Sequence, residues 1–157
     1  MKVPVGAPAP PFTLEGTLGT AETRRLFTLD EFRGDPVVLV FYPADASPIC
    51  TAQLTTYTND IDRFGELGAQ VVALSPQGVA QHEEFAAQHG GFAFPLLADV
   101  DRDVGAAYGV IGPIGFYRRS VFVLDAAGTI RYAHRATAGL TFRPVDELVG
   151  VLATLGR

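Results

Sequence analysis

Three stretches of the chain are uninterrupted apolar runs closed by turn residues. The longest covers residues 37–42 and is bounded by Gly34-Asp35-Pro36 on one side and Pro43 on the other. Similar runs occupy residues 70–75 and 120–125. A run without polar alternation is typical of a strand that is buried on both faces. The pattern therefore predicts a central strand at residues 37–42 and two further buried strands.

Between and after these strands, apolar residues recur every three or four positions, which is the spacing of one face of a helix. The three stripes consist of Leu54, Tyr57, Ile61 and Phe64, then Val79, Phe85 and Ala86, then Val145, Leu148, Val149, Leu152 and Leu155. They predict a helix after the central strand, a helix over residues 78–89 and a closing helix after Pro144. Cys50 lies four residues before Leu54, so the first helix carries a thiol at its start.

Strands that alternate with helices place the chain in the α/β class. Residues 125–128 join the third strand to residues 129–132, and Gly128 allows the positive φ of a tight turn, which predicts a terminal hairpin. The hairpin makes the central sheet mixed, with helices flanking both of its faces. Because the sequence has no repeat or low-complexity linker, we expect residues 1–157 to form a single domain.

Charge and hydropathy exclude several classes of partner. The formal net charge of −5 argues against nucleic acid, because that affinity depends largely on Lys and Arg that neutralise phosphates. The longest purely apolar run has six residues, against the roughly 20 that a membrane-spanning helix needs. No apolar signal core follows Lys2. We therefore expect a soluble, cytoplasmic protein without nucleic-acid or membrane partners.

Cys50 is the only cysteine in the sequence. One cysteine cannot form an intrachain disulfide, a cysteine-rich zinc site or a Cys-x-x-Cys redox pair, which leaves a small buried hydrophobe or a lone reactive thiol. Ser47 is a preferred N-cap and Pro48 suits the first helical position, so Cys50 falls in the first turn. The free N–H groups and the helix dipole there favour the nucleophilic thiolate. This location favours the reactive thiol.

The segment around Cys50 resembles a known signature. Pro43-x-x-x-Ser47-x-x-Cys50 is similar to the peroxiredoxin signature Pro-x-x-x-Thr/Ser-x-x-Cys, and its flanks Phe41-Tyr42-Pro43 and Cys50-Thr51 resemble the branch called bacterioferritin comigratory protein or Q-type. Further blocks resemble this branch in the order expected, at residues 10–14, 29–34, 94–99, 107–110 and 119–125, followed by Gly128. The resemblance therefore covers nearly the whole chain.

The resemblance implies a thioredoxin-like fold and the reduction of hydrogen peroxide or organic hydroperoxides, with no cofactor and no metal. It implies that Cys50 is the peroxidatic thiol, which attacks the peroxide and becomes a sulfenic acid. It further implies that Ser47 offers a hydroxyl to the peroxide oxygens, that Pro43 shields the thiolate and that Arg119 provides positive charge. Such groups stabilise the negative charge that spreads over sulfur and oxygen in the transition state.

Two positions depart from the Q-type pattern. That branch often has Glu three residues after the peroxidatic cysteine and a resolving cysteine five residues after it, where this chain has Gln53 and Thr55. Gln53 can still form hydrogen bonds. Thr55 removes the internal resolving thiol, so the resemblance implies a one-Cys cycle. The reductant would be an external thiol, such as thioredoxin, a glutaredoxin-like protein or a low-molecular-weight thiol, and the protein would be a monomer or a homodimer.

Other interpretations stay open at this point. A thioredoxin-like sensing module would be oxidised stoichiometrically without turnover, whereas an enzyme of the glutathione-peroxidase type typically carries a Trp, which this chain lacks. Ser47 would cap the helix whatever the function, and Arg119 can instead be a solvated surface charge. His82, His89 and His134 lack the spacing of metal ligands, which favours solvated or hydrogen-bonded histidines.

Overall fold

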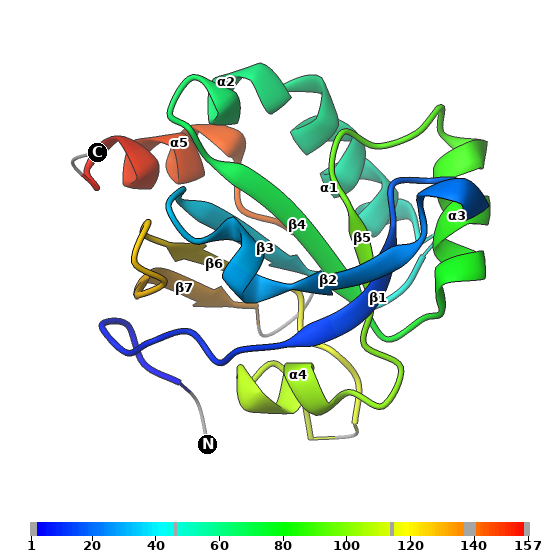
Figure 1. Ribbon diagram of the computed structural model, residues 1–157, viewed down its shortest axis with the longest axis horizontal. Coiled ribbons are helices and arrows are strands. Elements are labelled where there is room, and N and C mark those ends of the chain that lie inside the picture. Colours follow the sequence, from blue (N-terminus) through cyan, green and yellow to red (C-terminus); the bar gives the residue numbers. More distant parts are fainter. Residues whose placement is uncertain (1–2, 46, 114, 137–140, 156–157) are drawn as a thin grey trace.

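The computed structural model describes residues 3–45, 47–113, 115–136 and 141–155. Within these residues, seven strands form one sheet in the order β2-β1-β5-β4-β3-β6-β7 (Figure 1). The strands are β1 (Thr13–Thr17), β2 (Arg25–Thr28), β3 (Val37–Phe41), β4 (Gln70–Ser75), β5 (Leu96–Ala98), β6 (Ser120–Leu124) and β7 (Ile130–Arg135). β3, β4 and β5 run parallel, and the other neighbouring pairs are antiparallel. The sheet is therefore mixed, as predicted.

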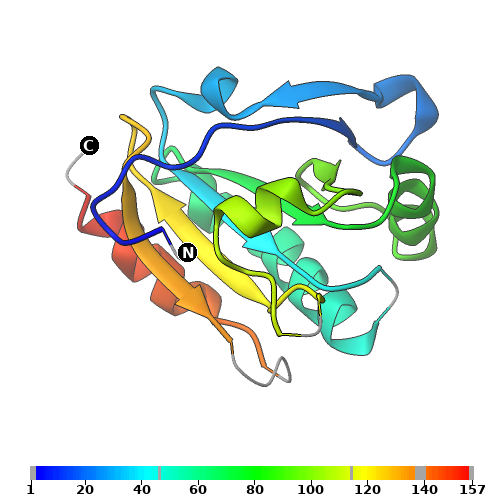
Figure 2. The same ribbon diagram turned by 90° about the horizontal axis from the view of Figure 1, so that it is seen from below.

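Helices cover both faces of this sheet. They are α1 (Pro48–Asn59), α2 (Ile61–Gly65), α3 (Val79–Gln88), α4 (Asp103–Ala107) and α5 (Val145–Ala153), with short 3-10 turns η1 (Ala21–Thr23) and η2 (Leu29–Phe32). α1, α2 and α5 lie on one face, and α4 lies on the opposite face (Figures 1 and 2). Among the described residues, none of these helices is both long and apolar enough to span a bilayer.

β3 divides its side chains between two cores, one on each face of the sheet. Val38 and Val40 pack into the core that includes Leu54 of α1 and Leu148 of α5. Leu39 packs into the opposite core, with Phe122 of β6 and Tyr108, which directly follows α4. The residues of β3 are at most 2% exposed. Burial on both sides explains why the strand has no polar alternation.

Most of the predicted elements are confirmed. β3, β4 and β6 correspond to the three apolar runs, α3 and α5 to the second and third stripes, and the hairpin turns at Gly128 with a φ of 86°. The prediction of one helix after the central strand is wrong, because the chain leaves helical geometry at Asp60. Two helices occupy this stretch, α1 before Asp60 and α2 after it. Asp60 has a φ of −104° and a ψ of 19°, and its backbone N–H closes α1 by donating to the Thr56 carbonyl at 3.1 Å. The sequence patterns did not predict β2, β5 or α4.

Candidate active site

The first turn of α1 presents Cys50 at the carboxyl end of β3. Ser47 is the N-cap, with extended backbone angles (φ −71°, ψ 144°), and Pro48 occupies the first turn. The Ser47 Oγ accepts a hydrogen bond from the backbone N–H of Cys50 at 3.2 Å, and the Thr51 hydroxyl donates to the Ser47 carbonyl at 2.8 Å. The predicted cap is confirmed, and it fixes Cys50 at the end of the helix where unpaired N–H groups favour a negative charge.

Arg119 reaches Cys50 from the neighbouring antiparallel strand. Phe41 of β3 pairs with Ser120 of β6, so Arg119, one residue before Ser120, lies beside the end of β3. Its Nη2 donates to the Cys50 Sγ at 3.3 Å. The Arg119 side chain is buried, at 4% exposure, so the interpretation as a solvated surface charge is wrong. A fixed guanidinium with N–H groups directed at sulfur stabilises a thiolate.

A chain of hydrogen bonds holds the Arg119 guanidinium in place. Arg119 Nη1 donates to Gln53 Oε1 at 2.8 Å, Gln53 Nε2 donates to the Tyr57 hydroxyl at 3.4 Å, and the Tyr57 hydroxyl donates to the Arg143 carbonyl at 2.5 Å. Because a guanidinium can only donate, Gln53 must present its oxygen to Arg119, which leaves its amide to donate to Tyr57. Burial raises the pKa of Tyr57 to about 12, so its hydroxyl keeps the proton that it donates. The donor and the acceptor of each hydrogen bond from Arg119 to the Arg143 carbonyl are therefore determined.

Arg118, the neighbour of Arg119, does not share this environment. Its backbone N–H donates to the Val110 carbonyl at 2.6 Å, and its half-buried side chain passes beside Gly112. Adjacent residues of an extended segment point to opposite sides. The geometry therefore favours Arg119, the residue that the resemblance implied, over Arg118.

The structure places the other predicted site residues near Cys50 in the chain, but it does not test all of their predicted roles. Pro43 is half-buried two residues after the end of β3, and its shielding of Cys50 stays a prediction. The action of the Ser47 hydroxyl on a peroxide also stays a prediction, because the observed bond is the helix cap. Thr55 is exposed on α1.

Two polar groups near the site, Tyr57 and Asp45, were not predicted from the sequence. Tyr57 lies on the apolar stripe of the first helix, and nothing in that pattern distinguished its hydroxyl from a core ring. Asp45 lies inside the signature segment, but its partner His82 follows 37 positions later. His82 is hydrogen-bonded, as one of the two interpretations had it, and is completely buried.

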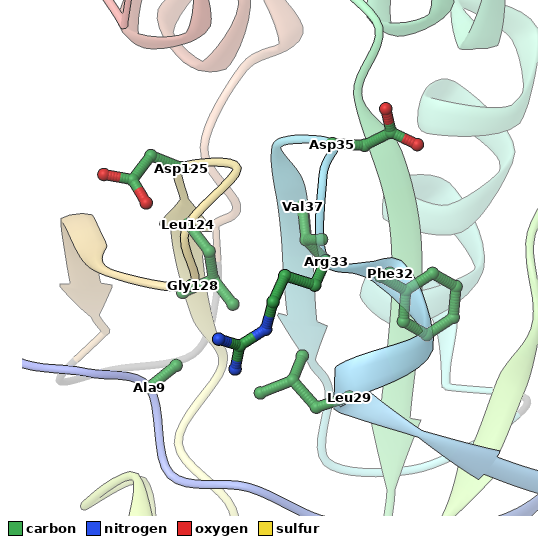
Figure 3. A pocket seen from close by; sticks show the side chains of 9 residues that line it. All are labelled: Ala9, Leu29, Phe32, Arg33, Asp35, Val37, Leu124, Asp125 and Gly128. Carbon is green, nitrogen blue, oxygen red and sulfur yellow. The ribbon is translucent and has the colours of Figure 1, made fainter.

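A small pocket lies at the opposite end of β3. It is lined by Ala9, Leu29, Phe32, Arg33, Asp35, Val37, Leu124, Asp125 and Gly128 (Figure 3). Its volume of about 30 Å³ suits little more than a water molecule. The Arg33 guanidinium in this pocket pairs with Asp30 at 2.9 Å. Because Val37 begins β3 and Cys50 follows its end, this pocket is separate from the thiol site.

Known proteins are similar to this chain in sequence. The AhpC/TSA family matches residues 5–133. A chloroplastic peroxiredoxin Q from Oryza sativa subsp. japonica is 35% identical over 137 residues, which cover 85% of this chain and 59% of the relative. A peroxiredoxin from Aquifex aeolicus is 31% identical over 166 residues, covering 98% of this chain and 71% of the relative. The chain thus spans about 59% of the length of the rice protein that it matches.

Solved structures agree with these matches. The Mycobacterium tuberculosis AhpC structure aligns with a TM-score of 0.90 and 26% identity, over 99% of this chain and 94% of the other. Reduced 2-Cys peroxiredoxin from Plasmodium vivax aligns with a TM-score of 0.86 and 23% identity, over 95% and 80%. These alignments confirm the expected thioredoxin-like fold of the peroxiredoxins. Together with the family match and the Cys50 environment, they show that the chain belongs to the AhpC/TSA family of peroxiredoxins.

Proposed function

We propose that this chain is a thiol-dependent peroxidase that reduces hydrogen peroxide and organic hydroperoxides through Cys50. Family membership supports the reaction class, and the 3.3 Å contact between Arg119 Nη2 and Cys50 Sγ is the observation that carries the assignment to this thiol. The contact gives the sulfur a buried guanidinium whose N–H donors are held in a fixed plane. A cysteine with only a packing role has no need of such a partner.

In the first half-reaction, the Cys50 thiolate attacks one oxygen of the peroxide. The S–O bond forms as the O–O bond breaks, and the leaving alkoxide or hydroxide takes a proton to become an alcohol or water. Sulfur is oxidised to the sulfenic acid, and the peroxide is reduced by two electrons. Arg119 and the Ser47 hydroxyl stabilise the charge that spreads onto the oxygens, while the Gln53–Tyr57 chain keeps the guanidinium from turning away.

In the second half-reaction, an external thiol restores Cys50, because the sequence holds no second cysteine. One thiol condenses with the sulfenic acid, which releases water and leaves a mixed disulfide. A second thiol then attacks the sulfur of the first, which releases Cys50 and a disulfide of the reductant. Thioredoxin, a glutaredoxin-like protein and low-molecular-weight thiols remain the proposed reductants. A monomeric or homodimeric state and a cytoplasmic location remain predictions from the sequence.

Turnover decides between an enzyme and a sensor. With excess dithiothreitol, we expect hydrogen peroxide and tert-butyl hydroperoxide to be consumed well beyond one equivalent per chain, and we expect Cys50→Ser to abolish this consumption. A single stoichiometric burst in the presence of the thiol would support the sensing module instead. Unchanged consumption in Cys50→Ser would remove the thiol from the reaction.

A further inference from the structure

Three polar side chains meet in a buried group beside the start of α1, two from the connection between β3 and α1 and one from α3. We call this group, Tyr42, Asp45 and His82, the Asp45 cluster. Tyr42 directly follows β3, Asp45 lies between β3 and α1, and His82 belongs to α3. The Tyr42 hydroxyl donates to Asp45 Oδ1 at 2.7 Å, and His82 Nδ1 lies 2.7 Å from Asp45 Oδ2. The Asp45 and His82 side chains are 6% and 0% exposed. Polar groups at this depth are costly without fixed partners.

The partners fix the roles of the hydrogen-bonding groups. His82 Nε2 lies 3.0 Å from the Leu97 carbonyl oxygen, which can only accept, so this nitrogen carries a proton. The Nδ1 atom faces the Asp45 carboxyl group within hydrogen-bond distance. Burial, followed by the negative charge of Asp45, raises the pKa of Tyr42 well above its ordinary value, so Tyr42 remains the donor. The carboxyl group is thus held from two sides.

The main chain of Asp45 is held as well. Its backbone N–H donates to the side-chain carbonyl of Gln77, which lies between β4 and α3. Two residues after Asp45, Ser47 caps α1 and accepts from the N–H of Cys50. The end of β3, the segment after β4 and α3 therefore together define the point from which α1 starts. The proposed mechanism uses none of the three residues of the Asp45 cluster.

We propose that Asp45 and His82 are positioning residues, which hold the first turn of α1 in the closed arrangement where Cys50 contacts Arg119. This inference rests on the proposed function, because it concerns the same thiol. Cys50 is 0% exposed in the closed arrangement. A peroxide is a small molecule, whereas an external thiol must bring a larger group in line with the oxidised sulfur. We therefore expect reduction to require a larger displacement of the first turn of α1 than oxidation does.

The two half-reactions therefore make opposite demands on the Asp45 cluster. Oxidation by peroxide is fastest when Cys50, Ser47 and Arg119 keep their fixed geometry, because positioned donors stabilise the transition state. Reduction by an external thiol is fastest when that turn opens easily, because local opening exposes the sulfur. Weakening the cluster should slow the first step and accelerate the second. A general loss of stability would not change the rates of the two half-reactions in opposite directions.

Two variants test this division, Asp45→Asn and His82→Gln. We expect oxidation of Cys50 by one equivalent of hydrogen peroxide to slow roughly tenfold, and reduction of the preformed sulfenic acid by dithiothreitol to accelerate about threefold. Because the chain has no Trp, both steps are followed by rapid quenching and mass spectrometry. His89→Gln, an exposed histidine just after α3, should leave both rates unchanged. Ile130→Ala, in the opposite core, controls for lowered stability.

A double variant and an added thiol provide independent measurements. Asp45 and His82 are in direct contact, so their effects should not be independent. In Asp45→Asn/His82→Gln, oxidation should be less impaired than the product of the single effects predicts. Thr55→Cys places a thiol five residues after Cys50, about 140° around the helix, where a disulfide needs the first turn to unwind. Adding Asp45→Asn to Thr55→Cys should accelerate formation of this intramolecular disulfide after peroxide.

The outcomes separate the inference from the proposed function. If peroxide leaves Cys50 of the unmodified protein unoxidised, the proposed function fails whatever the variants do. If that protein is oxidised but both half-reactions of Asp45→Asn and His82→Gln change in the same direction, or match those of Ile130→Ala, the positioning role is overturned. Opposite changes in the two half-reactions, absent from Ile130→Ala, establish it.

Discussion

At the scale of single residues, the site depends on the placement of one guanidinium. Arg119 donates through one nitrogen to the Cys50 sulfur and through another to Gln53, so its planar group is fixed at two points. Charge alone does not provide this arrangement, since a Lys ammonium has no fork of donors in a fixed plane. The chemistry therefore requires both the charge and the geometry of Arg119.

Arg119→Ala should slow oxidation of Cys50 by peroxide by about 100-fold to 1,000-fold, which is the usual effect of removing a donor to developing charge. Arg119→Lys should recover only part of the rate, because it restores the charge without the fork. Rapid-quench oxidation rates measure both effects. Arg118→Ala is the matched control, because the Arg118 side chain passes beside Gly112 rather than toward the sulfur. If Arg118→Ala alone slowed the oxidation of Cys50, the role would belong to Arg118 and not to Arg119.

Gln53→Glu should weaken the support that Arg119 gives to the thiolate. The carboxylate would compete with the thiolate for the guanidinium, and it would present an oxygen to the Tyr57 hydroxyl, whose hydrogen already points to the Arg143 carbonyl oxygen. We expect the thiolate fraction of Cys50 at neutral pH to fall and oxidation to slow, on the order of threefold to tenfold. Thiolate ultraviolet absorbance and the oxidation rate check this. An unchanged thiolate signal would show that the neutral amide has no electrostatic role.

At the scale of elements, α1 combines a structural cap with a catalytic position. Ser47→Ala should lower the free energy of unfolding by about 1 kcal/mol, because a backbone N–H loses its cap, and should also slow oxidation of Cys50. Ser47→Thr should restore both properties. Ser47→Asn should restore stability alone, since Asn caps helices well but offers no hydroxyl. Thermal unfolding and oxidation rates are compared across the three variants, and a full rate in Ser47→Asn would reduce Ser47 to its capping role.

Elements with a strong local pattern could be predicted from the sequence, and elements defined by tertiary contacts could not. β3 was identifiable because it is buried on both faces, and the start of α1 because Ser47 and Pro48 are local signals. β5 has only three residues. Its strand geometry depends on pairing with β1 and β4, and its burial on packing of Leu96 and Leu97 into the two cores, which are all contacts with distant parts of the chain. In the site, Cys50 and Arg119 were found through motifs. The Asp45–His82 contact joins residues 37 positions apart, and a single sequence carries no signal for it.

At the scale of the whole molecule, one sheet separates two cores and places the thiol at one end of its central strand. The core on the side of α1 and α5 contains Cys50 itself, whereas the opposite core extends under α4 and the residues before β1. A domain of this size is expected to unfold cooperatively. Changes far from Cys50 should therefore alter global stability while leaving the rate of the chemical step unchanged.

Two glycines test this separation in opposite directions. Gly150 lies in α5 with open space around its Cα, so Gly150→Ala should raise the free energy of unfolding by about 0.5–1 kcal/mol through a better helix former. Gly16 lies in β1, where a Cβ would overlap Leu97 Cδ2 and lie 2.8 Å from Phe27 Cδ1. Gly16→Ala should therefore lower the free energy by about 1–3 kcal/mol. Each kcal/mol corresponds to roughly 2–4 °C in Tm, which calorimetry resolves. Both variants should oxidise Cys50 at the unmodified rate at 25 °C, and a rate that follows Tm would mean that peroxide reaches the thiol only through global unfolding.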